Sequence, residues 1–262
     1  MSTSSFGNPL VEQRDLLSGK AAVALDSKII RVIGDDRLKW LHALLSQNIV
    51  NLLPGQSAEA LLLDPQGHIE ANLHIVDDGR ITWLVVEQTS AQLVFEHLNK
   101  MKLRTKVTIE LDGELQVFAT FGEPLPNANV VWLDPWPEVT PGGHRYAAKS
   151  GEVWSYVESI AESSSLGKAG TSALEALRVM AHRPSMEEVD DKTLPHELDW
   201  LATGVHLSKG CYRGQEAVAK VHNLGHPPRR LVLLHLDGSG HMLPEIGAKV
   251  YFGETEVGRV TT

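Results

Sequence analysis

The chain has 262 residues, of which 42% are hydrophobic and 22% are charged, and its formal net charge is −9. This composition is typical of a globular protein that is long enough for more than one compact unit. The acidic balance argues against a general affinity for phosphates, so we expect no direct nucleic-acid binding. No apolar run approaches the roughly 18 residues that a membrane span needs, and the N-terminus lacks a secretory pattern, so we expect no membrane association.

The first predicted elements are a strand and a helix. β-branched residues and a terminal glycine predict a buried strand over residues 28–34. An amphipathic pattern predicts a helix over residues 35–49, in which Asp35 accepts from the first N–H groups. Its expected core face consists of Leu38, Leu41, Leu44 and Leu45.

Three strand-like runs follow, over residues 57–64, 67–77 and 80–87. The last two are joined by an Asp-Gly pair, which is a strong hairpin signal. A second helix is predicted over residues 89–101. Its expected core face consists of Leu93, Val94, Leu98 and Met101.

The middle of the chain is less regular. Residues 105–111 and 115–122 flank a second Asp-Gly pair and predict another hairpin. Residues 123–143 are rich in Pro and Gly and predict an irregular connection with at most one short strand. A third helix is predicted over residues 171–183, opened by a capping box of Ser172 and Glu175 and closed before Pro184.

A domain boundary is predicted at Pro227-Pro228, because neither proline can donate to a continuing ladder. The sequence pattern of the residues beyond this boundary predicts strands joined by turns. The predicted fold class is therefore α+β with a β-rich tail.

The single cysteine, Cys211, cannot form an internal disulfide, which fits a reducing cytoplasm as the expected location. An iron–sulfur cluster held by four cysteines of this chain is excluded. The histidines, including His222 and His226, lack the paired spacing of zinc ligands, so no metal site is predicted.

Cys211 lies in a segment of mixed charged, polar and glycine residues. The segment consists of Lys209, Gly210, Cys211, Tyr212, Arg213, Gly214, Gln215 and Glu216. Positive charge from Lys209 and Arg213 would stabilise a thiolate, which makes Cys211 a candidate reactive thiol. The glycines allow close approach of a backbone or a ligand. The alternative is that Cys211 is a small buried residue on a turn.

Two further segments carry polar side chains. In the strand over residues 67–77, Glu70 and Asn72 should point to one face and Ala71 to the other. Glu197 and Asp199 lie around Trp200 in the sequence, and a carboxylate beside an aromatic ring suits a heterocyclic ligand such as a pterin. The sequence contains no nucleophile elbow, P-loop or dinucleotide-binding glycine motif.

These segments occur in an order that resembles the YgfZ group of folate-binding proteins. The segment KGCYRGQEAVAK is similar to the K-G-C-[FY]-x-G-Q-E signature of that group. The group is related to the T-protein of the glycine cleavage system (GcvT), a tetrahydrofolate-dependent aminomethyltransferase. Residues 29–49, 61–76, 176–186 and 194–211 also resemble blocks of this family. The resemblance thus extends over roughly residues 28–262.

The resemblance implies a GcvT/YgfZ-like ring of three domains around a central folate cleft. The first domain would comprise about residues 1–50 and 123–229, and the second about residues 51–122. Residues 230–262 would begin a C-terminal β-barrel, which we expect to be incomplete because the chain stops at VGRVTT.

The implied function is binding of tetrahydrofolate, or a one-carbon derivative, in support of iron–sulfur cluster assembly or repair and thereby tRNA modification. Iron–sulfur proteins would be partners. Asn72 and Glu197 would contact the folate, and Cys211 would lie at the cleft mouth. One alternative is a true aminomethyltransferase, but this chain has Ala71 and Asn72 where T-proteins carry an aspartate pair, so enzymatic activity is left open. Another is a binding module whose cleft holds no folate.

Overall fold

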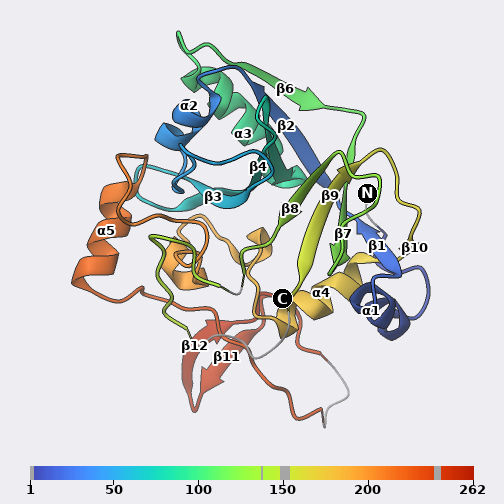
Figure 1. Ribbon diagram of the computed structural model, residues 1–262. Coiled ribbons are helices and arrows are strands. Elements are labelled where there is room, and N and C mark those ends of the chain that lie inside the picture. Colours follow the sequence, from blue (N-terminus) through green and yellow to red (C-terminus); the bar gives the residue numbers. More distant parts are fainter. Residues whose placement is uncertain (1–2, 137, 148–153, 239–242) are drawn as a thin grey trace.

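The computed structural model describes residues 3–136, 138–147, 154–238 and 243–262. Two five-stranded sheets and a separate two-stranded hairpin form the strands of the fold (Figure 1). Helices lie on the outer faces of the sheets, as expected for an α+β protein, and the predicted fold class is confirmed.

The first sheet has the strand order β3-β4-β5-β2-β6, and all its neighbours are antiparallel. Its strands are β2 (Ser27–Ile33), β3 (Ser57–Leu63), β4 (Ile69–Asp77), β5 (Ile81–Glu87) and β6 (Thr108–Asp112). Helices α2 (Arg37–Leu44) and α3 (Gln88–Met101) cover one face of this sheet (Figure 1). The strand predicted over residues 28–34, the β4–β5 hairpin and the helix over residues 89–101 are confirmed.

The second sheet has the strand order β10-β1-β7-β9-β8, with β1 and β10 parallel and the other pairs antiparallel. Its strands are β1 (Ala21–Ala24), β7 (Gln116–Phe121), β8 (Val130–Leu133), β9 (Tyr156–Ala161) and β10 (Gly167–Lys168). Helices α1 (Pro9–Leu17) and α4 (Thr171–Met180) lie beside it (Figure 1).

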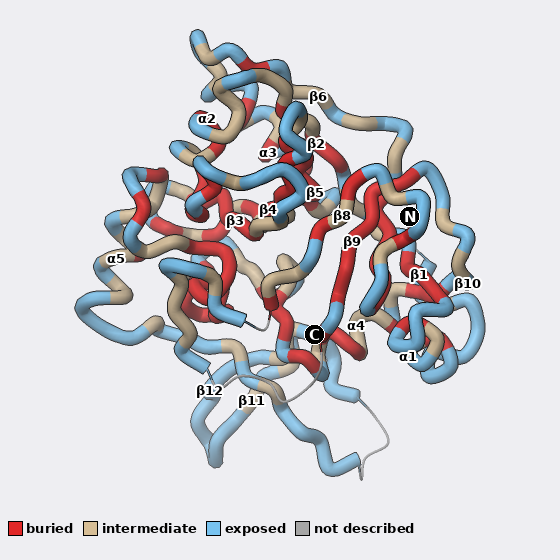
Figure 2. Tube along the Cα trace, in the orientation of Figure 1, coloured by how far each residue is buried: buried red, intermediate tan, exposed pale blue. Residues whose placement is uncertain are grey.

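Two large apolar cores hold these layers together. One lies between the first sheet and helices α2 and α3, around Leu41, Leu73 and Leu98. The other joins the two sheets and includes Ile29, Trp132 and Ile160, and Figure 2 shows β9, the strand of Ile160, as buried. Because β4 is thus covered on both faces, any polar side chain on it must find a partner inside the protein.

The hairpin predicted over residues 105–122 is wrong. The chain does turn at the Asp-Gly pair, where Asp112 Oδ1 accepts from the backbone N–H groups of Glu114 and Leu115. However, β6 pairs with β2 in the first sheet, whereas β7 pairs with β1 and β9 in the second. The reason is burial, because Val117 joins the core between the sheets and would lose that environment beside β6.

Two predicted helix starts also differ from the structure. The residue before α2 is Asp36, which makes no capping bond with its side chain, so Asp35 does not cap this helix. Helix α4 follows Gly170 without a capping box, and Glu175 instead binds Arg178 at 2.9 Å. On the two predicted helix faces, several residues are only partly buried or exposed. These are Leu38, Leu44, Leu93 and Met101.

The C-terminal part begins with α5 (Gln215–Leu224) and ends in the antiparallel hairpin of β11 (Lys249–Phe252) and β12 (Thr255–Arg259). Within the described ranges no third strand joins this hairpin, so no closed barrel forms there, in agreement with the incomplete barrel that was expected. Within the same ranges, no helix combines the length and the apolar character needed to cross a bilayer. The domain boundaries near residues 50, 122 and 229 stay a prediction.

Candidate functional site

The cysteine motif forms the loop that leads into α5, and glycine is required where this loop crosses the β3–β4 turn. Gly214 has a φ of +84°, and a Cβ there would lie 2.6 Å from the carbonyl oxygen of Asp64. Gly67, on the facing turn, has a φ of +85°, and its Cβ would lie 3.0 Å from that of Ala217. The expected close backbone approach therefore occurs at Gly214. Gly210 has open space around it.

Cys211 is exposed, so it is not the buried turn residue of the alternative interpretation. It lines a cavity of about 560 Å³ between the cysteine motif and helices α2 and α3. Gln215 and Glu216 begin α5, and the Gln215 side chain donates to the Lys209 carbonyl oxygen at 3.1 Å.

The two cations beside Cys211 have other partners. Lys209 is 8% exposed, and its ammonium group donates to the carbonyl oxygens of His42, Leu45 and Gln47 at the end of α2. Because an ammonium group has three donors, none is left for a thiolate. Burial lowers the pKa of Lys209 to about 8. Arg213 pairs with Glu70 at 2.8 Å, so the expected stabilisation of a thiolate by both flanking residues does not follow from this geometry.

A β-bulge separates Glu70 from Asn72. Leu62 pairs with Ala71 and Leu63 pairs with Ile69, so Glu70 is the extra residue. Glu70 therefore reaches Arg213 beside the cavity, whereas Asn72 donates to Glu59 Oε1 at 2.7 Å. Glu70 and Asn72 were expected on one face, but they have different partners, because the bulge interrupts the alternation of side chains between them.

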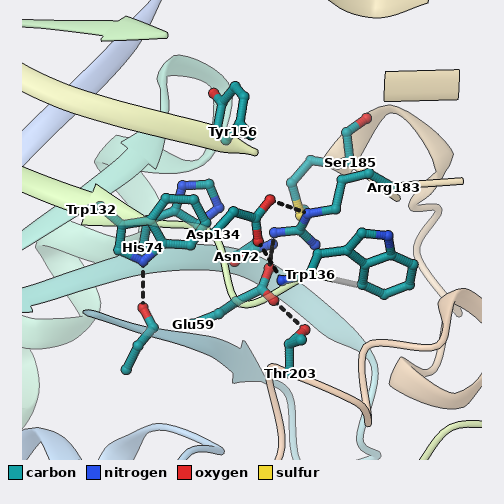
Figure 3. Close-up of polar contacts among 12 residues, drawn as sticks. Glu59, Asn72, His74, Trp132, Asp134, Trp136, Tyr156, Arg183, Ser185 and Thr203 are labelled. Carbon is teal, nitrogen blue, oxygen red and sulfur yellow. Dashed lines mark hydrogen bonds and ion pairs between the residues drawn. The ribbon is translucent and has the colours of Figure 1, made fainter. Parts of the chain in front are cut away.

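The partners of Asn72 belong to a buried polar network, which we call the Glu59–Arg183 network (Figure 3). Arg183 Nη2 donates to Glu59 Oε1 at 2.8 Å, and Arg183 Nε donates to Asp134 Oδ2 at 2.9 Å. The Thr203 hydroxyl also donates to Glu59. The Glu59 side chain is 0% exposed and that of Arg183 is 5% exposed, so this is an ion-paired group inside the protein.

The positive charge of Arg183 opposes the effect of burial on the pKa values of the two carboxyl groups that it binds, those of Glu59 and Asp134. Burial alone would raise the pKa of Glu59, but the charges of Arg183 and His74 outweigh burial and lower it. Burial raises the pKa of Asp134 against the attraction of Arg183. The pKa of Arg183 itself is raised, since the two carboxylates exceed the effect of its burial. Arg183 and Glu59 are therefore both charged at neutral pH.

The aromatic side chains of His74, Trp132 and Tyr156 lie beside the Glu59–Arg183 network. The His74 ring stacks on Trp132, with centroids 3.7 Å apart, and His74 Nδ1 lies 2.9 Å from Glu158 Oε2. Burial would lower the pKa of His74, but the charge of Glu158 and its hydrogen bond raise it. Tyr156 donates to the other oxygen of Glu158 at 2.9 Å.

Two polar atoms of the Glu59–Arg183 network lack a hydrogen-bond partner among the described residues. They are Arg183 Nη1 and the Asn72 carbonyl oxygen, and both are buried. An unpaired buried donor or acceptor costs roughly 1–3 kcal/mol. The two side chains, one with an unpaired donor and one with an unpaired acceptor, both bind Glu59 Oε1, and Figure 3 shows His74 and Trp132 beside them. Such a pair suits the edge of a flat heterocycle.

Glu197 lies apart from Asn72. It is in the 3₁₀-helix over Pro195–Leu198, where its Oε2 accepts from Arg229 Nε at 2.8 Å and its Oε1 has no partner. Burial raises the pKa of Glu197, against the charge of Arg229. Throughout the described ranges, no hydrogen bond joins Glu197 to Asn72. The two residues therefore do not form one site by direct contact.

Sequence reasoning missed most of the Glu59–Arg183 network, although two signals were present. Glu59 is the one charged residue in β3, and His74 is its cross-strand partner in β4. Asp134 and Arg183 each precede a proline in an irregular region and gave no signal. Across the part of the chain that the structure describes, no cluster of three or more His, Cys, Asp or Glu residues is arranged to hold a metal ion.

No protein-family model matches the chain. A chloroplastic protein of Arabidopsis thaliana, named as a candidate transferase, is 25% identical over 89% of this chain and 59% of its own length. The mitochondrial iron–sulfur cluster assembly factor IBA57 homolog of Mycosarcoma maydis is 25% identical over 79% of this chain and 54% of its own length. The tRNA-modifying protein YgfZ of Klebsiella pneumoniae is 26% identical over 85% of this chain and 72% of its own length.

The chain thus spans 59% and 54% of the first two of these relatives. Among solved structures, the fold is similar to that of the glycine cleavage system aminomethyltransferase T from Bartonella henselae, with a TM-score of 0.63. That match is 17% identical in sequence and covers 84% of this chain and 67% of the other. At this identity the similarity concerns the fold alone.

Proposed function

We propose that the chain, which is similar to IBA57 and YgfZ proteins and shares the fold of a glycine cleavage aminomethyltransferase, binds tetrahydrofolate or a one-carbon derivative. We propose further that it supports the assembly or repair of iron–sulfur clusters and thereby the modification of tRNA. The single observation that carries the folate proposal is the unsaturated Glu59–Arg183 network.

The residues of this network fit a pterin ring. A pterin edge offers both an acceptor and a donor, which complement Arg183 Nη1 and the Asn72 carbonyl oxygen. Trp132 and His74 supply aromatic surface beside these atoms. When bound, tetrahydrofolate would supply the capacity to carry a one-carbon unit. This chain would supply binding, orientation and exclusion of water.

A specific observation disfavours the aminomethyltransferase alternative. Ala71 is 0% exposed within the core under α2 and α3, and the Asn72 amide is engaged by Glu59. Neither side chain can take up and release a proton as an aspartate does. Formation of methylenetetrahydrofolate from an aminomethylated carrier protein would reverse this ranking.

Folate binding is tested by isothermal titration of the reduced protein with tetrahydrofolate in the absence of oxygen. We expect saturable binding that is weakened at least several-fold by Asn72→Ala, because the amide is lost from the network. Asn51→Ala, at an exposed turn position, is the matched control and should bind like the wild type. Glu197→Ala tests the second predicted contact, and an unchanged affinity would remove Glu197 from the site. A folded protein without folate binding would contradict the proposal.

The cellular role needs a separate test. We propose that the protein acts in the cytoplasm and that iron–sulfur proteins are its partners. Cys211→Ser should leave the fold intact, since the thiol is exposed, but should lose cellular activity. Full rescue of a deletion strain by this variant would exclude an essential role for the thiol. A stable complex with an iron–sulfur protein, together with no folate binding, would favour a binding module.

A further inference from the structure

The cavity beside Cys211 is a second feature, separate from the Glu59–Arg183 network. It is bounded by Leu44 of α2, by Lys100 and Met101 of α3 and by Tyr212 of the cysteine motif. Helices α2 and α3 cover the face of the first sheet that is formed by Ala71 and Leu73, whereas the network lies on the opposite face. A ligand in this cavity would therefore be distinct from one at the network.

The charged groups of this cavity are predominantly positive. Lys100 and Arg213 both line it. Lys100 is exposed, and among the residues that the structure describes its side chain forms no ion pair or hydrogen bond. Glu70 offsets part of the charge of Arg213 by pairing with it at 2.8 Å. His97 also lines the cavity, and burial, together with the charges of Arg213 and Lys100, lowers its pKa.

The remaining wall is apolar. Leu44, Met101 and Tyr212 contribute aliphatic, thioether and aromatic surface. A cavity that combines such a wall with an unpaired ammonium group suits a molecule with an apolar body and one negative charge. We propose that this cavity binds a small organic anion, held at its charged end by Lys100 and Arg213. The shared chemistry is a carboxylate or phosphate group on an apolar body.

Cys211 allows the proposal to be tested, because its thiol lines the same cavity and is the only one in the chain. Iodoacetate and iodoacetamide alkylate a thiol by the same reaction but differ in charge. The ratio of their rate constants therefore reports the local potential. We expect this ratio to be roughly three- to tenfold higher in the native protein than in the same protein unfolded in urea. The excess should diminish at high salt.

Two variants and one pair of ligands make the test specific. Lys100→Gln should remove most of the excess, whereas Lys39→Gln, an exposed residue of α2 that does not line the cavity, should leave it unchanged. Benzoate should protect Cys211 from iodoacetamide in a saturable manner, and the uncharged benzamide should protect several-fold less well. A native ratio equal to the unfolded one, or equal protection by benzoate and benzamide, would overturn the proposal. Neither readout depends on folate binding, so the two proposals fail independently.

Discussion

Replacing Arg183 by methionine removes the cation that Glu59 and Asp134 share, and it leaves both acids buried. The Arg183 side chain is 5% exposed, that of Glu59 0% and that of Asp134 1%. Removal of one partner from such a buried pair costs about 3–5 kcal/mol. For a chain of this length we expect a fall in melting temperature on the order of 10 °C.

The pH dependence identifies the cause of this loss. In the wild type the pKa of Glu59 lies below its ordinary value of 4.5, so its stabilising contribution is present above pH 4.5 and is lost as the pH falls further. Without Arg183, burial raises the pKa of Glu59, and the folded state then gains by taking up a proton. The deficit of Arg183→Met should therefore be largest near pH 8 and should shrink towards pH 5.

Urea unfolding followed by tryptophan fluorescence at several pH values measures the deficit. Arg14→Met is the matched control, because the Arg14 side chain is 72% exposed and pairs only with its neighbour Asp15 in a surface contact. It should leave the midpoint unchanged. An Arg183→Met protein with wild-type stability, or with a deficit that does not vary with pH, would refute the account of the network as a compensated buried charge cluster.

Two further predictions concern other parts of the structure. Burial lowers the pKa of His196 from 6.5 to about 4, so the unfolded chain takes up a proton first as the pH falls. The wild type should lose roughly 3 kcal/mol from this group between those pH values. His196→Gln should flatten that part of the stability curve, and a curve with an unchanged acid limb would disprove the assignment. Gly214→Ala should cost about 1–3 kcal/mol, because its φ is +84° and its Cβ would lie 2.6 Å from a carbonyl oxygen. Gly210→Ala has open space and is the control, and equal costs at the two positions would contradict the close-approach argument.

Local patterns in the sequence determined several elements of the fold. The strand β2 follows from its β-branched residues, the helix α3 from its apolar periodicity, and the β4–β5 hairpin from Asp78-Gly79. The cysteine motif and the order of the segments carried the resemblance to the YgfZ group, since both are properties of the linear chain. The requirement for glycine at position 214 was also visible there, although its contact with Asp64 was not.

Tertiary structure alone decided which strands pair and which charges meet. The second Asp-Gly pair turns the chain as expected, but the following strand is drawn to another sheet because its apolar residues fill the core between the sheets. Glu59 and Arg183 are 124 residues apart in the chain, and Lys209 is 164 residues from Leu45. Coulombic and hydrogen-bond partners at such separations are set by packing, and no local pattern encodes them.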